Sequence, residues 1–261
     1  VVLTPQERSG IFTIANYKFN DSVEGYTDFF INSTRSSYII APLPFDARLD
    51  DTIVSANNGY NPFGQDFGGI SGVNGNLLNR FSALGNRTTS YQTDVAQINL
   101  GLRGNLSAIT ALPNLADWTW DAGIGYGRVE QQVDRTGYIF GPALKDALGP
   151  TFVRADNSLG CGTSLATEIA GCTPINIFNL EDAAQVAALQ SVSANAGSTQ
   201  NNVLKTATFN LAGDVLPLPA GALSVALGAE YREERQTNDV DFLARALAPN
   251  FDTCYLSQET C

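Results

Sequence analysis

The stretch that most constrains the fold is a run of strict alternation at 223–232, inside a longer segment, 211–239, that begins with a short turn. Apolar or aromatic side chains occupy every second position, and small or charged side chains occupy the positions between. The two sets are Leu223, Val225, Leu227, Ala229 and Tyr231, and Ser224, Ala226, Gly228, Glu230 and Arg232. Because a strand points successive side chains to opposite faces, this pattern predicts a wall with lipid outside and a polar interior.

The same alternation recurs in three other segments. Residues 96–103, 118–127 and 203–211 place apolar side chains on one face and polar residues or glycine on the other. In the first two, the apolar set spans about ten residues, which is enough for a tilted strand to cross a bilayer. Residues 11–20 and 25–38 are rich in aromatic and β-branched residues and predict another antiparallel pair with a tight turn. The sequence therefore predicts an all-β fold with about six antiparallel strands.

Trp118 and Trp120 lie beside a predicted turn. In a membrane wall this is where an interfacial girdle of aromatic side chains occurs. The alternative interpretation is that both rings belong to the core of a β-sandwich.

The predicted connections alternate in length. Short connections follow Phe19, Leu102 and Leu211, within the strand pairs. Long connections follow Tyr38, Val133 and Asp239; the first two are the segments 39–87 and 136–201, and 242–261 begins the third. Outer-membrane barrels show this asymmetry, with short periplasmic turns and long extracellular loops, and a sandwich gives no reason for it. The aromatic residues of the first long segment argue for an ordered loop. The second is predicted to contain a short helix at 180–192, with Asn179 as its N-cap.

Composition excludes several classes of function. No run of 18 apolar residues exists, so a transmembrane helix is not expected. The net charge of −11 argues against a nucleic-acid partner, because binding to phosphates requires a basic surface. The chain has no histidine, which rules out a Ser/His/Asp or Cys/His catalytic arrangement. We therefore expect neither an enzyme nor a protein with a cofactor.

Four cysteines form two close pairs, Cys161 with Cys172 and Cys254 with Cys261. Metal sites normally use tighter cysteine spacing or histidine ligands, so zinc is the weaker interpretation and no metal site is expected. Two local disulfides formed in an oxidising compartment fit better. Each would stiffen a loop without holding the strands together.

Two groups of residues are candidates for function. Arg103, Glu230 and Arg232 are predicted to face the lumen, where charge pairs either hold an internal domain or are simply hydrated. The long loops offer candidate ligand-binding residues, because binding groups concentrate on ordered loops above a rigid scaffold. These candidates are Tyr60, Asn61, Phe63, Asp66 and Asn176. The alternative is that they only pack one loop on another.

Several segments resemble one family in the order in which they occur. These segments are ANNGYNPFG at 56–64, GPALKDALGP at 141–150, CTPINIF at 172–178 and LPAGALSVALGAEYREER at 218–235. The sequence is similar to the barrel of TonB-dependent outer-membrane receptors of Gram-negative bacteria. The resemblance implies a barrel of about 22 strands around an N-terminal plug. It also implies surrounding outer-membrane lipid and lipopolysaccharide, and uptake of a scarce extracellular ligand such as a siderophore, oligosaccharide or peptide, coupled to TonB through the plug.

The sequence departs from that family in extent. About six strands cannot close a barrel of that size, and a plug and a TonB-binding segment are missing. We therefore expect 1–261 to be the central part of one barrel domain within a longer polypeptide. Two other functions remain open at this point. One is a non-transporting outer-membrane surface protein for adhesion or assembly, and the other is a secreted, disulfide-bonded all-β binding domain.

Overall fold

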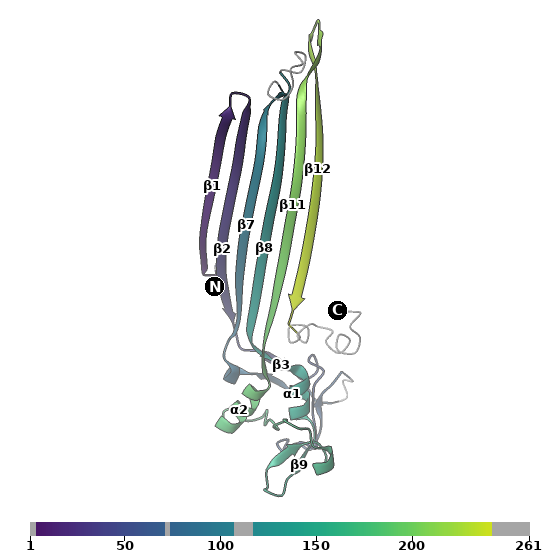
Figure 1. The fold of residues 1–261 in the computed structure, drawn as a ribbon. Coiled ribbons are helices and arrows are strands. Elements are labelled where there is room, and N and C mark those ends of the chain that lie inside the picture. Colours follow the sequence, from purple (N-terminus) through teal and green to yellow (C-terminus); the bar gives the residue numbers. More distant parts are fainter. Residues whose placement is uncertain (1–3, 71–73, 107–116, 242–261) are drawn as a thin grey trace. The chain divides into compact units, whose positions relative to one another are not determined.

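The computed structural model describes residues 4–70, 74–106 and 117–241, and it is mostly β-structure, with 60% strand and 11% helix. Its main element is an antiparallel sheet of six strands in which sequence neighbours are also sheet neighbours (Figure 1). The strands are β1 (Gln6–Asn20), β2 (Val23–Ile40), β7 (Arg87–Asn105), β8 (Thr119–Ile139), β11 (Ser193–Leu218) and β12 (Gly221–Val240). The predicted all-β fold with an antiparallel sheet is confirmed.

Each predicted strand exists and is longer than its alternating segment. The strand predicted at 203–211 is the centre of the 26-residue β11, and the one predicted at 118–127 is the first half of the 21-residue β8. The strands continue beyond the segments in which apolar and polar residues alternate, because the backbone hydrogen bonds between strands do not require an apolar face. The described strands form an open sheet, and no closed barrel is detected among them.

Short turns join the strands at one end of the sheet. Two residues connect β1 to β2, and the amide of Ser22 donates to the side chain of Asn20 in this turn (2.8 Å). Two residues also connect β11 to β12, and Gly221, the first residue of β12, has a φ of 134°, which residues with a side chain rarely adopt. The long connections leave from the opposite end of the antiparallel strands. The short turns after β1 and β11 and the two long connections after β2 and β8 are present as predicted, whereas most of the connection between β7 and β8, and the one after β12, lie outside the described residues.

The chain divides into two compact units. Among the described residues, the sheet unit comprises 4–36, 91–106, 117–132 and 199–239, and the loop unit comprises 37–70, 74–90, 133–198, 240 and 241. The two long connections therefore join in one compact unit instead of forming separate loops.

The loop unit contains short elements around a hydrophobic core. Its strands pair in three small antiparallel sheets, β3 with β6, β4 with β5, and β9 with β10. Its elements are β3 (Pro44–Asp46), β4 (Ile53–Val54), β5 (Phe67–Gly68), β6 (Leu78–Arg80), η1 (Ser82–Leu84), α1 (Gly141–Leu148), β9 (Thr151–Val153), β10 (Leu159–Cys161), η4 (Leu165–Thr167) and α2 (Ala183–Ser191).

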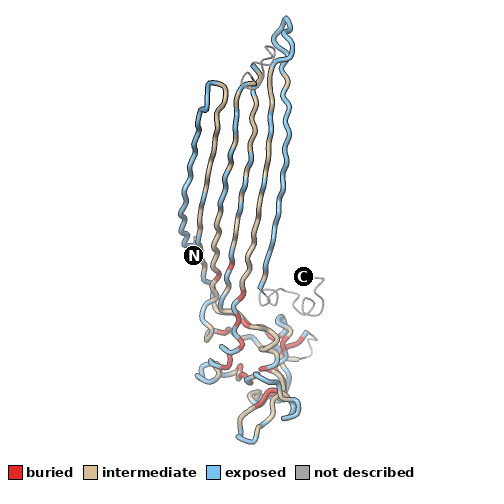
Figure 2. The backbone as a smooth tube through the Cα atoms, viewed as in Figure 1, coloured by how far each residue is buried: buried red, intermediate tan, exposed pale blue. Residues whose placement is uncertain are grey.

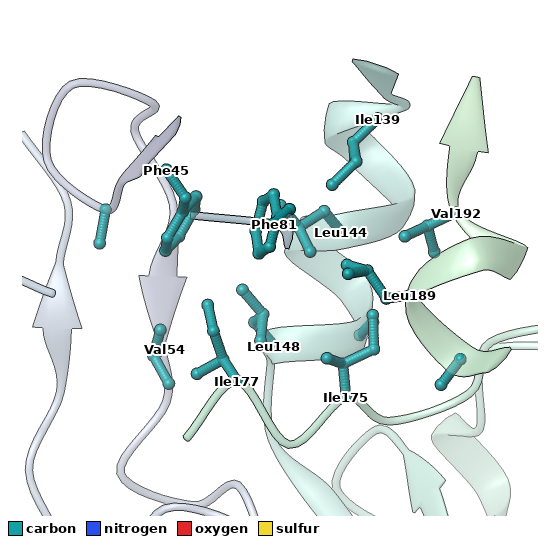
Figure 3. Close-up of a cluster of buried hydrophobic side chains, with 13 residues drawn as sticks. Phe45, Val54, Phe81, Ile139, Leu144, Leu148, Ile175, Ile177, Leu189 and Val192 are labelled. Atoms are coloured by element: carbon teal, nitrogen blue, oxygen red, sulfur yellow. The ribbon is translucent and has the colours of Figure 1, made fainter. Parts of the chain in front are cut away.

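Thirteen buried residues from both long connections form the core of the loop unit. Phe81 lies beside Phe45, with ring centroids 5.3 Å apart, and helix α1 contributes Leu144 and Leu148 (Figure 3). Leu189 of α2 and Ile175 enter the same core from the second connection. Segments that are about a hundred residues apart in sequence thus stabilise each other by burying apolar surface.

Polar contacts join the same two connections. The side chain of Asn58 donates to the carbonyl of Gly149 (2.9 Å), and that of Asn79 donates to the carbonyl of Ile177 (2.9 Å). These asparagines satisfy backbone groups that no regular ladder reaches. The described residues of 39–87, a segment expected to be ordered, therefore share a core and hydrogen bonds with the second long connection.

Two local predictions in the loop unit need correction. Asn179 is not the N-cap of the second helix. That helix begins at Ala183, and the Asp182 carboxylate accepts the amides of Ala184 (2.9 Å) and Gln185 (3.3 Å). Asp182 is favoured because a cap must directly precede the first helical residue. Helix α1 was not predicted, although Pro142 lies in its first turn, where proline is well tolerated.

The disulfide between Cys161 and Cys172 is present, with Cα atoms 6.0 Å apart, as predicted. It connects the end of β10 to the segment that leads to Ile175 in the core. Cys254 and Cys261 lie outside the described residues, so their pairing stays a prediction.

Burial separates the two units sharply (Figure 2). Every buried residue of the described chain belongs to the loop unit, whereas the sheet unit has only half-buried and exposed residues. No helix among the described residues is long and apolar enough to cross a membrane.

Candidate functional site

The two faces of the large sheet can be assigned from the strand register. Tyr17 is paired with Gly25 and Ile11 with Ile31, so these residues share one face. The intervening positions, such as Tyr26, point to the other face. Contacts between neighbouring strands, described below, extend the assignment across the sheet. We call the two sides the apolar face and the polar face.

The apolar face carries one band of exposed hydrophobic side chains across all six strands. Large members of the band are well exposed, for example Ile124 at 61% and Leu227 at 60%. The band consists of Phe19, Tyr17, Ala15, Thr13 and Ile11 on β1; Gly25, Thr27, Phe29 and Ile31 on β2; Leu102, Leu100, Ile98 and Ala96 on β7; Trp120, Ala122, Ile124 and Tyr126 on β8; Leu211, Phe209 and Ala207 on β11; and Leu223, Val225, Leu227, Ala229 and Tyr231 on β12.

Charged and polar side chains end the band on the side away from the short turns. Arg128 is ion-paired with Glu130 immediately after the last apolar position of β8. On the neighbouring strands, Lys205 lies 3.4 Å from Glu233, and the two side chains are half exposed. The face therefore changes from apolar to charged at Arg128 on β8 and at Lys205 and Glu233 on β11 and β12, although the strands extend beyond these residues.

Aromatic side chains mark the end of the band next to the short turns. Tyr17 and Phe19 pack edge to face, with centroids 5.1 Å apart. Trp118 lies over Gly213, where an added Cβ would come within 2.2 Å of the indole ring. Its Nε1 also donates to the carbonyl of Asp214 (3.0 Å). Trp118 and Trp120 thus lie at the end of the sheet where the short turns are, and their place in an interfacial girdle stays a prediction.

The polar face contains a network around Tyr26. The ring of Tyr26 covers Gly101, where an added Cβ would lie 2.2 Å from Cζ, and the Arg103 guanidinium lies 5.5 Å from the ring centroid. Arg103 also donates to Glu24 (3.0 Å). The glycine at position 101 of β7 thus leaves room for the Tyr26 side chain of the neighbouring strand β2.

A second set of polar contacts lies farther along the same face. Asn99 donates to Asp28 (2.8 Å), and its own oxygen lies beside Gly125. The polarity of this face is incomplete near β1, where Phe12 and Phe30 pack edge to face with centroids 6.5 Å apart. The polar face therefore carries charged and polar side chains around Tyr26 and Asn99, and apolar ones, including the exposed Ile14, near β1.

The three charged residues predicted to face the lumen all lie on the polar face. Arg103 pairs across strands with Glu24, whereas Arg232 pairs along its own strand with Glu234 (3.1 Å). Glu230 shares this face by its position on β12. Their role in contacting an internal domain stays a prediction.

The loop unit brings together two of the predicted ligand-binding segments. The amide side chain of Gln185 donates to the Tyr60 hydroxyl (3.2 Å), and its oxygen accepts the backbone amide of Asn176 (2.7 Å). Tyr60 and Asn176, 116 positions apart by their numbers, are thereby linked through one residue of α2. The sequence offered no signal that selected Gln185.

Phe63 belongs to a cluster of three aromatic rings. Its centroid lies 5.5 Å from that of Phe67 and 5.6 Å from that of Phe178, both in edge-to-face geometry. Phe63 is nevertheless 61% exposed, so the cluster presents an aromatic surface to solvent. Phe178 ends the NIF sequence of the resembling segment but was not selected as a candidate.

The remaining candidates have backbone partners. Asn61 donates to the carbonyls of Ser55 (2.9 Å) and Gln65 (2.9 Å), and Asp66 accepts the amide of Ala56 (2.6 Å). These contacts shape the 55–66 loop and use part of each side chain's hydrogen-bonding capacity. A contact with ligand stays a prediction for both residues.

Comparison with known proteins supplies no family assignment, because no protein-family model matches the chain and no match appears among curated protein sequences. Within the described residues, no three His, Cys, Asp or Glu side chains gather in a way that could hold a metal ion. The two faces of the sheet and the loop unit are therefore the features that bear on function.

Proposed function

We propose that the chain forms part of the wall of an outer-membrane β-barrel receptor in a Gram-negative bacterium. The observation that carries the proposal is the bounded apolar band on one face of the sheet. An exposed apolar surface of this extent is unusual for a soluble monomer and marks a surface that meets another apolar phase.

The height of the band matches a bilayer. Nine residues of strand span about 30 Å, and a tilt near 40° reduces this to about 23 Å along the membrane normal. The hydrocarbon-facing band of such barrels is about 25 Å tall, with aromatic side chains at its borders. In a sandwich core, by contrast, there would be no reason for charged pairs such as Arg128–Glu130 and Lys205–Glu233 to follow the apolar positions on three neighbouring strands.

The orientation follows from the connections. Short turns belong to the periplasmic side and long connections to the cell exterior in bacterial barrels. The loop unit then lies outside the cell, where lipopolysaccharide surrounds the barrel. The oxidising environment outside the cytoplasm is compatible with the disulfide between Cys161 and Cys172.

Transport rather than adhesion is favoured by the resemblance to TonB-dependent receptors. In this function the loop unit captures a scarce ligand, and the exposed Phe63 cluster and Tyr60 offer aromatic contact surface. The polar face lines the interior, with Arg103 and Arg232 available to an internal plug that TonB engages. Adhesion or assembly with partners is the second candidate, because the loop unit has a core of its own.

Two experiments test the proposal. The natural protein should sediment with the outer membrane and require detergent for release; release in soluble form without detergent contradicts the membrane assignment. Deletion of its gene should abolish growth on one scarce nutrient, and loss of TonB should reproduce that defect. A deletion strain that loses only adhesion supports the second candidate.

A further inference from the structure

A groove of about 630 Å³ crosses β1, β2, β7 and β8 on the sheet and reaches Ala207 of β11. Its side walls on the apolar face are Tyr17 and Phe19 on one side and Leu100, Leu102 and Ile124 on the other. The groove arises because small residues interrupt a band of large ones.

Gly25 is the floor of the groove. A Cβ at this position would lie 2.9 Å from the Phe19 ring and 3.5 Å from Leu102, so the missing side chain separates these two walls. Ala122 provides a second small residue on β8. Neither glycine nor alanine offers a polar side chain, and the exposed lining of the groove is mainly apolar.

The position of the groove within the band restricts what can fill it. Gly25 and Leu102 are the apolar positions nearest the short turns on β2 and β7, beside the aromatic end marked by Tyr17 and Phe19. The charged end of the band, at Arg128, is on the opposite side. A ligand here meets hydrocarbon-like walls and a border of aromatic side chains, which is the environment of a lipid chain below its headgroup.

We propose that this groove holds one acyl chain of a phospholipid from the periplasmic leaflet. The inference rests on the proposed function, which places the short turns on the periplasmic side. Phospholipid is chosen over lipopolysaccharide because lipopolysaccharide occupies the leaflet at the other end of the band. A chain seated against Gly25 gains contacts that a flat wall of leucine side chains cannot offer.

The test is native mass spectrometry of the natural protein extracted in mild detergent, with the retained lipids identified by fragmentation. Wild-type protein should retain one phospholipid under detergent washing that strips the remaining lipids. Gly25→Leu and Ala122→Leu, which fill the groove from two strands, should each reduce this retention at least tenfold. Ala229→Leu is the matched control, because it adds the same atoms to the same face on β12, outside the groove.

The outcomes separate the inference from the proposed function. Equal phospholipid retention in all four proteins overturns the inference, as does retention of lipopolysaccharide in place of phospholipid. A protein that never enters the outer membrane contradicts the proposed function instead. Membrane insertion of each variant is checked by flotation with liposomes, so that a folding defect is not mistaken for loss of the lipid.

Discussion

The sheet unit and the loop unit place their apolar side chains in opposite ways. In the loop unit, thirteen residues from two distant connections form a buried core. In the sheet unit, no described residue is buried, and large side chains such as Ile124 stay exposed. A loop unit of this kind carries its own source of stability, whereas the sheet depends on what covers its faces.

This difference also explains why the same chain can combine a regular and an irregular region. A ladder of backbone hydrogen bonds holds the strands in register without a core. The loop unit lacks long ladders, and side chains such as Asn58 and Asn79 satisfy its backbone groups instead. An irregular unit with a core of its own can hold binding residues in fixed positions.

The largest expected effect concerns the buried core. Leu148→Ala should lower the stability of the loop unit by about 2–5 kcal/mol, because Leu148 is fully buried and the substitution leaves a cavity. Leu49→Ala, at a position 86% exposed in the same unit, should change it by less than about 0.5 kcal/mol. Hydrogen exchange of loop-unit amides measures both. Similar protection in the two variants contradicts the assignment of the core.

A charge introduced on the apolar face tests whether that face of the sheet unit contacts lipid. Leu227→Arg should destabilise the protein in lipid vesicles by about 2–4 kcal/mol, since position 227 is at the middle of the apolar band. Ala226→Arg, one residue away on the polar face, should be nearly neutral. Denaturant titration in vesicles compares the two variants. Equal effects would mean that the two faces of the sheet meet the same surroundings.

Removal of the disulfide should affect the loop unit alone. Replacing both Cys161 and Cys172 with alanine should cost about 2–3 kcal/mol in the chain-entropy treatment, because the bridge closes a short loop. Hydrogen exchange should rise near Ile175 and remain unchanged in β8 and β11. A rise that spreads through the large sheet would show that the two units are energetically coupled.

The smallest effect involves an exposed carboxylate of the loop unit. Hydrogen bonds from the Asn76 side chain and the Leu49 backbone amide lower the pKa of Asp46 below its ordinary value of 3.8. The stabilisation is complete above that value and is lost as the pH falls through the lower pKa of the folded state. Asp46→Asn should remove this dependence. Thermal unfolding of the wild type and of Asp46→Asn across the acidic pH range compares the two proteins. The same pH dependence of stability in both would contradict the prediction.

Much of the sheet was predictable because its signal is local. Alternation at 223–232 identifies β12 and assigns both of its faces without reference to any other strand. The short turn before it and the close pair Cys161 and Cys172 are also local features. In each case, neighbours in the sequence carry the whole of the physical constraint.

The loop unit could not be predicted in this way. Helix α1 is only eight residues long, too short for a clear periodic pattern. Its Leu144 and Leu148 are buried only because other segments of the chain pack against them. The candidate residues Tyr60 and Asn176 were selected from separate loops, but their common partner Gln185 follows only from the fold. Asn179 looked like a cap because the start of α2 was placed too early.

The sequence by itself determined which side chains share a face of the sheet, because successive side chains of a strand point to opposite faces. It also determined the alternation of short and long connections. Only the tertiary structure decided that the two long connections share one core. Contacts between residues about a hundred positions apart produce no repeating pattern in the sequence from which they could be predicted. The groove at Gly25 likewise appeared only when Phe19 and Leu102 were brought to its sides by the neighbouring strands.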